Sequence, residues 1–241
     1  MERGKKIKIS RLLKLRLLFV NMDDFVNFGA FSYSKKLWHP LNAVLNEFDA
    51  GTGFDHRTSI SSKFYAKYNL TGNKGFLPVH SGNWNSVIMA YIPPWGGGKV
   101  ANPSNDFEHW IGPKTPEQID NFLKHFHELY LKIKKEGYKP LKYKDGFLRV
   151  IILRNVRKTK FLIVGGLKRS SILSHCGYKK LWVRLQYPDK NYPGNMPSVV
   201  DVKDLDNWPN VINGLYTKED AMAFFYEYFK EDNRNTFIIE N

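Results

Sequence analysis

The stretch KFLIVGGLKRSSILSHCGYKKLWVRLQY, residues 160–187, contains the pattern that decides the fold. The apolar run at residues 161–164 predicts a β-strand, and two glycines, Gly165 and Gly166, end it. A short amphipathic helix follows and ends at Gly177, which suits the left-handed conformation of a helix C-cap. Its buried face is expected to hold Ile172, Leu173 and Cys176. The segment therefore predicts a strand, a glycine turn, a helix and a second strand.

The turn between this strand and this helix is the strongest candidate for a binding site. Gly165 and Gly166 let a ligand approach the backbone closely. The first turn of the helix leaves N–H groups unpaired, and these carry a partial positive charge. Side-chain donors are expected at the same place from Lys168, Arg169, Ser170 and Ser171. The sequence therefore predicts a site for a phosphate or another anion.

The order strand, glycine turn, basic pair, short helix, Gly and strand resembles the core of the ParB/sulfiredoxin superfamily. The resemblance implies that Gly165, Gly166, Lys168 and Arg169 cradle the phosphates of a nucleotide such as ATP, ADP or CTP, bound with Mg²⁺. Leu167 stands where sulfiredoxins carry a reactive Cys, which argues against sulfinic acid reduction. Gly165 and Lys168 replace the usual Asp and His of the turn, so a catalytically inactive binding module is an alternative.

Three further motifs resemble uncharacterised ParB-like proteins encoded among bacterial surface-polysaccharide genes. These motifs are the His-Pro pair at residues 39–40, WIGP at 110–113 and WPNVINGLY at 208–216. This likeness covers most of the chain, but the proteins concerned have no established reaction that it could imply. Our leading hypothesis is a nucleotide-binding protein of this superfamily that acts as a phosphotransferase on a small molecule or a glycan precursor.

Phosphoryl transfer depends on positioning and charge neutralisation, with one carboxylate as base. Asp55, Asp145 and Asp201 are the candidates for that base, and the sequence does not choose among them. His39 and Arg57 lie near Asp55 in a polar segment and are candidate substrate contacts. Loop capping is the alternative role for these polar residues.

A metal site built by protein alone is not expected. His125 and His127 lie two residues apart on a predicted helix and therefore face different sides. The single cysteine, Cys176, excludes both an intramolecular disulfide and a thiolate cluster for zinc. This cysteine usage fits a reducing compartment, and the cytoplasm is the expected location.

The net charge of +14 is distributed unevenly along the 241 residues. Residues 1–16 carry seven Lys or Arg against one Glu, and residues 132–169 carry thirteen against two acids. This excess around the glycine turn favours a polyanionic ligand: a nucleotide, nucleic acid or anionic lipid head groups. DNA or RNA binding through the basic face is an alternative function, although no helix-turn-helix, zinc finger or RNP aromatic string is present.

The composition, 42% hydrophobic and 15% aromatic, predicts a globular protein. The helices and strands expected along the chain predict the α+β class, with a small mixed sheet packed against helices. An irregular aromatic-rich part is expected at residues 1–113 and the ParB/sulfiredoxin-like domain at 114–241. Helices are predicted at 41–48, at 116–136 with Thr115 as N-cap, and from Thr217 onward.

Two segments leave alternatives open. Residues 7–20 have leucines at helical spacing among basic residues, which predicts a basic helix that either packs on the domain or makes peripheral contact with an anionic membrane. This stretch is too short and too charged for a signal peptide or a membrane span, and no transmembrane segment is expected elsewhere. The PPWGGG element at 93–98 is either a surface loop, which we favour, or a lid.

Overall fold

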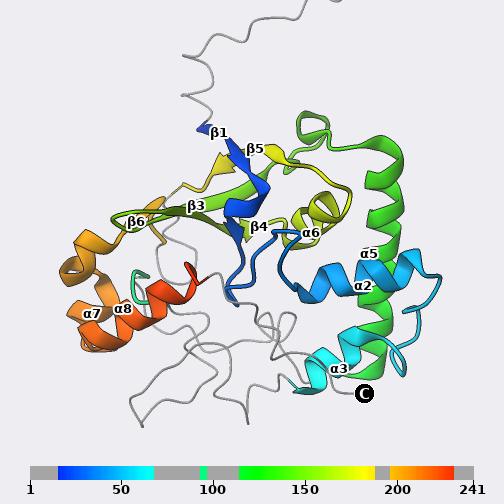
Figure 1. Cartoon of the computed structure of the whole chain (residues 1–241), viewed down its shortest axis with the longest axis horizontal. Coiled ribbons are helices and arrows are strands. Elements are labelled where there is room, and N and C mark those ends of the chain that lie inside the picture. Colours follow the sequence, from blue (N-terminus) through cyan, green and yellow to red (C-terminus); the bar gives the residue numbers. More distant parts are fainter. Residues whose placement is uncertain (1–15, 68–92, 97–113, 188–195, 231–241) are drawn as a thin grey trace, which may run out of the picture.

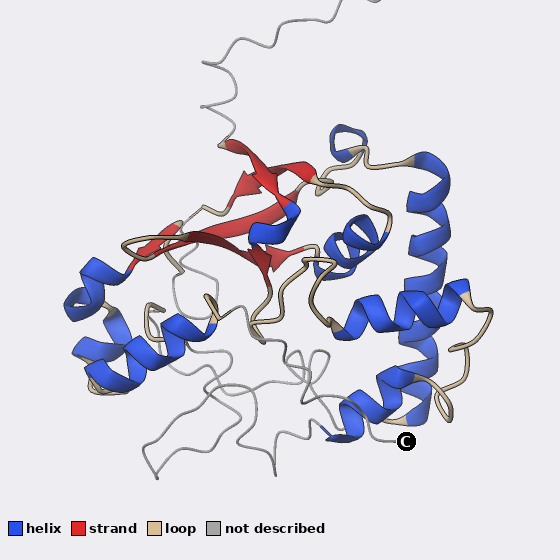
Figure 2. Ribbon diagram, viewed as in Figure 1, coloured by secondary structure: helices blue, strands red, loops and turns tan. Residues whose placement is uncertain are grey.

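The computed structural model of the chain describes residues 16–67, 93–96, 114–187 and 196–230. It consists of a six-stranded mixed sheet with helices packed on both faces (Figures 1 and 2). The predicted α+β class, with a mixed sheet packed against helices, is confirmed.

The sheet has the strand order β1-β5-β3-β4-β2, and β6 pairs with β3 off this path. The strands are β1 (Leu17–Asn21), β2 (Phe25–Val26), β3 (Leu148–Arg154), β4 (Thr159–Gly165), β5 (Lys180–Leu185) and β6 (Val199–Asp201). β3 runs antiparallel to β4 and parallel to both β5 and β6, β1 runs antiparallel to β5, and β2 is parallel to β4. One sheet thus joins strands from both sides of the boundary predicted at residue 113.

β1 corrects the helix predicted for residues 7–20. Residues 17–21 pair with β5, and their burial alternates: Val20 is buried, whereas Phe19 is exposed. That period of two belongs to a strand that covers a core on one face only. The remainder of the predicted helix, residues 7–15, lies outside the described residues.

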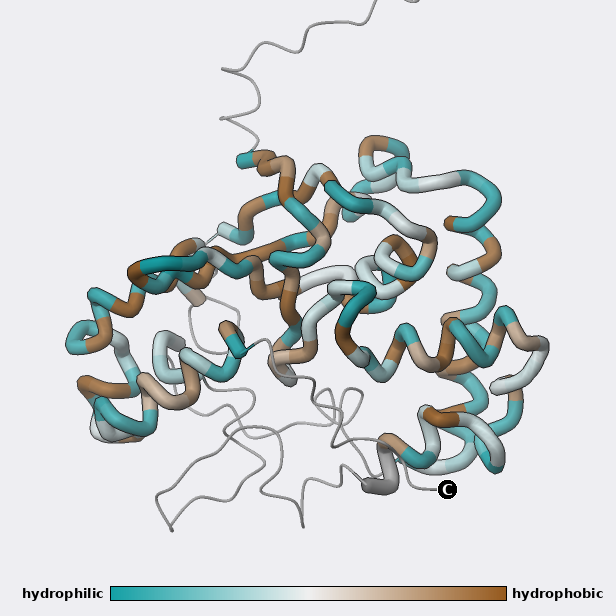
Figure 3. Tube along the Cα trace, in the orientation of Figure 1, coloured by the Kyte–Doolittle hydropathy of each residue, from teal (hydrophilic) through white to brown (hydrophobic). Residues whose placement is uncertain are grey.

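α5 (Pro116–Glu136) has the predicted bounds and caps. The Thr115 hydroxyl accepts a hydrogen bond from the Gln118 backbone N–H, and the Gln118 side chain accepts one from the Thr115 N–H. Gly137 ends the helix with a φ of 75°. Hydrophilic and hydrophobic residues alternate along this helix in Figure 3, and its apolar side packs against α2, α3 and α6.

The other helices divide between the two faces. α2 (Pro40–Asp49), α3 (Ile60–Lys67) and α6 (Leu167–His175) pack with α5 on one face. α7 (Pro209–Ile212) and α8 (Lys218–Glu227) lie on the other face. Short 3-10 helices occupy Met22–Asp24, Pro140–Lys142 and Val202–Asn207. The helices predicted near 41–48 and after Thr217 are therefore confirmed, and Thr217 is the N-cap of α8.

Trp95 is the centre of the core around α8. Its side chain is 1% exposed and lies edge-to-face with Trp208, Phe224, Phe225 and Tyr228 at ring-centroid distances of 5.5 to 5.9 Å. The buried Asn210 side chain holds the segment by donating to the Pro93 carbonyl at 2.8 Å. Residues 93–96 are therefore part of the core rather than a surface loop, which corrects the sequence-based expectation.

We expect Trp95→Ala to lower the free energy of unfolding by about 3–5 kcal/mol, because it leaves a cavity among the surrounding rings. Trp95→Phe should retain most of the stability, since the Trp95 indole N–H is buried without a hydrogen-bond partner in the structure. Urea denaturation monitored by circular dichroism measures both. An alanine variant as stable as the wild type would contradict this packing.

A polar network ties three helices together at the Asp49 carboxylate. The carboxylate accepts hydrogen bonds from the Tyr130 hydroxyl at 2.6 Å and from Lys134 Nζ at 3.1 Å, both on α5. His175 Nε2, at the end of α6, lies 2.7 Å from it. The Tyr130 hydrogen bond, followed by that of His175, holds the pKa of Asp49 well below its usual range. The network therefore stabilises the charged form of Asp49.

Because the folded pKa of Asp49 is depressed, its contribution is present above the unfolded pKa of about 3.9 and is lost as pH falls through the folded value. Asp49→Asn should lower stability at pH 7 by about 1 kcal/mol, discounted for the solvent exposure of the carboxylate. The wild-type advantage should shrink below about pH 4. Denaturant midpoints from pH 2 to 7, with Asp206→Asn as surface control, measure this. A pH-independent difference would contradict the network.

Candidate anion-binding site

The backbone of the predicted turn has the geometry of an anion site. β4 ends at Gly165, and Gly166 caps α6 with φ 95° and ψ 30°, a left-handed conformation that favours glycine. The helix then begins at Leu167. Within the described part of the chain, no acceptor contacts the N–H groups of Leu167, Lys168 and Arg169. Three donors are therefore available at the positive end of the α6 dipole.

Two arginine side chains lie against this turn. A Cβ added at Gly165 would lie 2.6 Å from Nε of Arg149, which projects from β3. A Cβ added at Gly166 would lie 3.1 Å from Nη2 of Arg169 and 2.6 Å from Leu148. The absence of side chains at both glycines thus allows the guanidinium groups to approach the backbone.

Backbone carbonyls hold Arg169 in place. Its Nη1 donates to the Asp145 carbonyl at 2.7 Å and to the Gly146 carbonyl at 2.5 Å, in the loop before β3. Burial lowers the pKa of Arg169, and the nearby charge of Arg149 acts in the same direction. Among the described residues, neither arginine forms an ion pair with a carboxylate. Two positive charges therefore share the turn without an ion pair among the described residues, although the charges of Tyr138 and Asp145 act on the pKa of Arg169 in the opposite direction.

Lys168 has a different position from that of Arg169. Its ammonium lies 4.7 Å from the ring centroid of Phe122 on α5, and its side chain is half-buried. Burial lowers the pKa of this lysine. The Lys168 charge is therefore held against α5 in this structure.

Ser170 and Ser171 differ from the expectation that they donate to the anion. Both are fully buried, and their hydroxyls donate to the Leu167 carbonyl at 2.8 and 3.3 Å. They lie on the side of α6 that packs into the core with Ile172. Cys176, expected on that same side, is exposed instead. The helix rotation therefore removes both hydroxyls from the outer surface of the turn.

The three candidate carboxylates lie in three different settings. The backbone carbonyl of Asp145 contacts Arg169, so this residue adjoins the turn. Asp201 caps a 3-10 helix by accepting from the Lys203 N–H and lies 3.7 Å from Arg154. Asp55 pairs with Arg57 in the loop before α3. The structure thus places only Asp145 next to the predicted turn.

Asp55 and Arg57 occupy a local cluster instead of the anion site. Arg57 hydrogen bonds lower the pKa of Asp55 to about 2. His56 contacts Asp120 of α5 at 2.9 Å, and ligand atoms of Asp55, His56 and Asp120 lie within 4.8 Å of one another. Arg57 already pairs with Asp55, and the backbone N–H and ring of His56 already contact Asp120, so the cluster is explained by its internal contacts.

His39, a predicted substrate contact, is a structural residue. It is 1% exposed and caps α2 by accepting from the Leu41 N–H at Nδ1. Its ring lies 4.5 Å from that of Tyr33. Burial lowers the pKa of His39 to about 3, so the imidazole is neutral at physiological pH. The alternative capping role therefore describes this histidine.

Comparison of the chain with family models, curated proteins and solved structures finds no match. None of the helices in the described residues combines the length and the apolar character needed to cross a membrane. The function must therefore be inferred from the geometry of the turn.

Proposed function

We propose that the turn at Gly165 and Gly166 binds the phosphate groups of a nucleotide. The observation that carries this proposal is the convergence of Arg149 and Arg169 on the N-terminus of α6, where neither forms an ion pair with a carboxylate of the described residues. A phosphate would accept hydrogen bonds from the first-turn N–H groups and neutralise both guanidinium groups. It would thus relieve the repulsion between two adjacent positive charges.

The resemblance to the ParB/sulfiredoxin superfamily makes ATP, ADP or CTP with Mg²⁺ the proposed ligand. The proposed reaction is phosphoryl transfer to a small molecule or glycan precursor in the cytoplasm. Of the three candidates, Asp145 is the one whose backbone carbonyl contacts Arg169 and whose charge acts on Arg169, which makes it the preferred base. A nucleotide-binding module without catalysis is the second candidate, since Asp55 and Asp201 are engaged elsewhere.

Arg149→Ala and Arg169→Ala should each weaken nucleotide binding about 10- to 100-fold, because each removes a charge-assisted hydrogen bond. Thermal-shift titrations with ATP, ADP, CTP and GTP, with and without Mg²⁺, measure this effect. Arg157→Ala, in the exposed turn between β3 and β4, is the matched control and should bind as the wild type.

Arg169 also anchors the 145–146 loop, so each variant is first compared with the wild type in ligand-free thermal unfolding. Arg149 makes no such anchoring bond to the residues that the structure describes, so Arg149→Ala separates binding from folding. Unchanged affinity in a folded Arg149→Ala protein would overturn the site. Turnover of the bound nucleotide distinguishes the phosphotransferase from the inactive module.

A further inference from the structure

The outer face of β1 and β5 is a surface on which exposed rings and basic side chains occur together. Leu181 and Val183 face the core beneath α5 and α6, so the alternate residues of β5 face outward. Phe19 on β1 is 56% exposed and Trp182 on β5 is 41% exposed. Large exposed rings at paired positions indicate a surface for binding.

The two rings form a continuous platform. Phe19 and Trp182 are cross-strand partners, with ring centroids 5.0 Å apart and an interplanar angle of 37°. Tyr187, just after β5, is 52% exposed, and the Arg16 guanidinium lies over its ring at 4.5 Å. Flat rings on an open sheet can accept the faces of unpaired bases.

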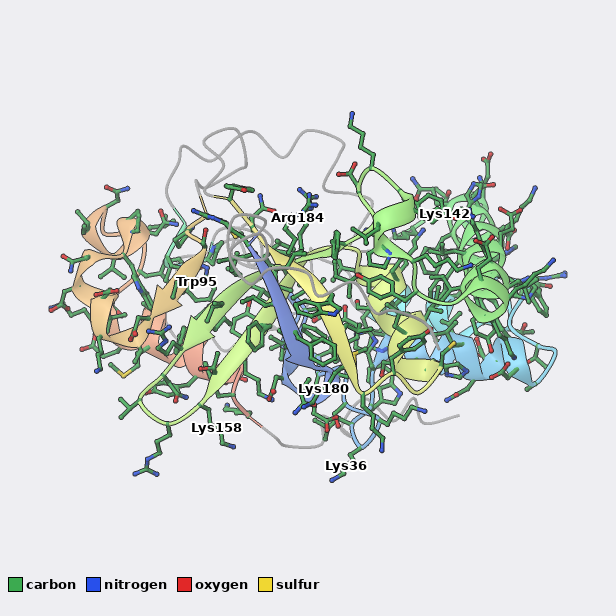
Figure 4. All side chains as sticks on the ribbon, turned by 90° about the horizontal axis from the view of Figure 1, so that it is seen from above. Lys36, Trp95, Lys142, Lys158, Lys180 and Arg184 are labelled. Carbon is green, nitrogen blue, oxygen red and sulfur yellow. The ribbon has the colours of Figure 1, made fainter. Side chains whose placement is uncertain are left out.

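Positive charges surround these rings. Lys180 and Arg184 lie on β5 at the positions two residues before and after Trp182, and Figure 4 shows them toward opposite ends of the strand. Arg184 is held over the Phe147 ring at 5.1 Å. In the described residues, no carboxylate forms an ion pair with Lys180 or Arg184. The charge of this face is therefore available to an anionic partner.

The strand register connects this surface with the glycine turn. Leu17, Arg184, Arg149 and Gly165 are successive partners across β1, β5, β3 and β4. Neighbouring strands lie about 4.8 Å apart, so this row spans about 14 Å from β1 to the turn. This row, which holds the two arginines Arg184 and Arg149 beside exposed rings, has the dimensions to follow a sugar–phosphate backbone.

We propose that this face, the β1–β5 platform, binds single-stranded nucleic acid. Bases stack on Phe19 and Trp182, and phosphates contact Lys180 and Arg184. The net charge of +14 and the seven basic residues among residues 1–16, directly before β1, favour the same anionic partner. This interaction is additional to the proposed nucleotide site.

Two other partners fit the platform less well. A second copy of the chain paired along β1 would bring like charges together on this face. A membrane surface requires a larger apolar area than three rings lying on a sheet. Single-stranded nucleic acid matches both the rings and the charges, because every base has a flat face and every nucleotide a phosphate.

Fluorescence anisotropy with labelled single-stranded oligo(dT) and oligo(U) tests the proposal. Trp182→Leu should weaken binding about 5- to 150-fold, whereas Trp182→Tyr should retain it, because only the leucine variant lacks a stacking face. Tyr226→Leu, which removes an exposed ring on α8, should have no effect. The main chain of Trp182 holds β5 in the sheet and the Tyr226 side chain is exposed on α8, so all three variants should fold, and circular dichroism verifies this.

Charge is tested separately. Arg184→Gln should lower the slope of log affinity against log salt by about 1, whereas Arg157→Gln should bind as the wild type. Equal losses in these two variants, with no loss in Trp182→Leu, would overturn the proposal in favour of non-specific charge attraction. No oligonucleotide binding, or tighter binding to phosphatidylserine vesicles than to oligonucleotide, would also overturn it. Arg169→Ala should retain oligonucleotide binding while losing nucleotide, which separates the two sites.

Discussion

Burial of the β3–β4 hairpin on both faces is the constraint on which the rest of the structure depends. Val150 and Ile151 are neighbours in β3, both are fully buried, and each packs into a different core. A strand of this kind needs covering layers on both sides. One layer is built by α2, α5 and α6, and the other by α8 together with Trp95 and Trp208. Segments distant in sequence are thus brought to the same hairpin because its two apolar faces must both be removed from water.

That constraint ends at β5 and β1, which have only one covered face. The core beneath α5 and α6 continues under these strands, whereas among the described residues the layer around Trp95 does not extend over them. Their other face therefore remains open, and it holds Phe19, Trp182 and Arg184. Gly165 lies at the end of the same cross-strand row. The two proposed binding surfaces thus lie next to each other, because the sheet is covered on both faces at its centre and on one face at its edge.

Local signals predicted the elements whose ends are fixed by nearby residues. The capping box of Thr115 and the turn at Gly166 depend on contacts within a few residues, so both could be recognised in the sequence.

Pairing between residues far apart in the sequence could not be recognised in this way. Leu18 fits a helical spacing as well as a strand, and only its pairing with β5 decides between them. Arg149 is one of many basic residues until the register places it beside Gly165, and Trp95 has no nearby signal for its partners on α8. Ser170 was misplaced because the rotation of α6 follows from packing.

The way in which Arg169 is held explains how a basic site can be ordered before its ligand binds. Carbonyl groups accept its hydrogen bonds and fix the orientation of the guanidinium, yet they carry no net charge to neutralise it. A carboxylate in the same place would order the side chain and also quench its charge, as Asp55 does for Arg57. The turn thus combines a fixed geometry with a charge that forms no ion pair with the described residues, next to Arg149. Such preorganisation lowers the entropy lost on binding and leaves the electrostatic attraction for an incoming anion.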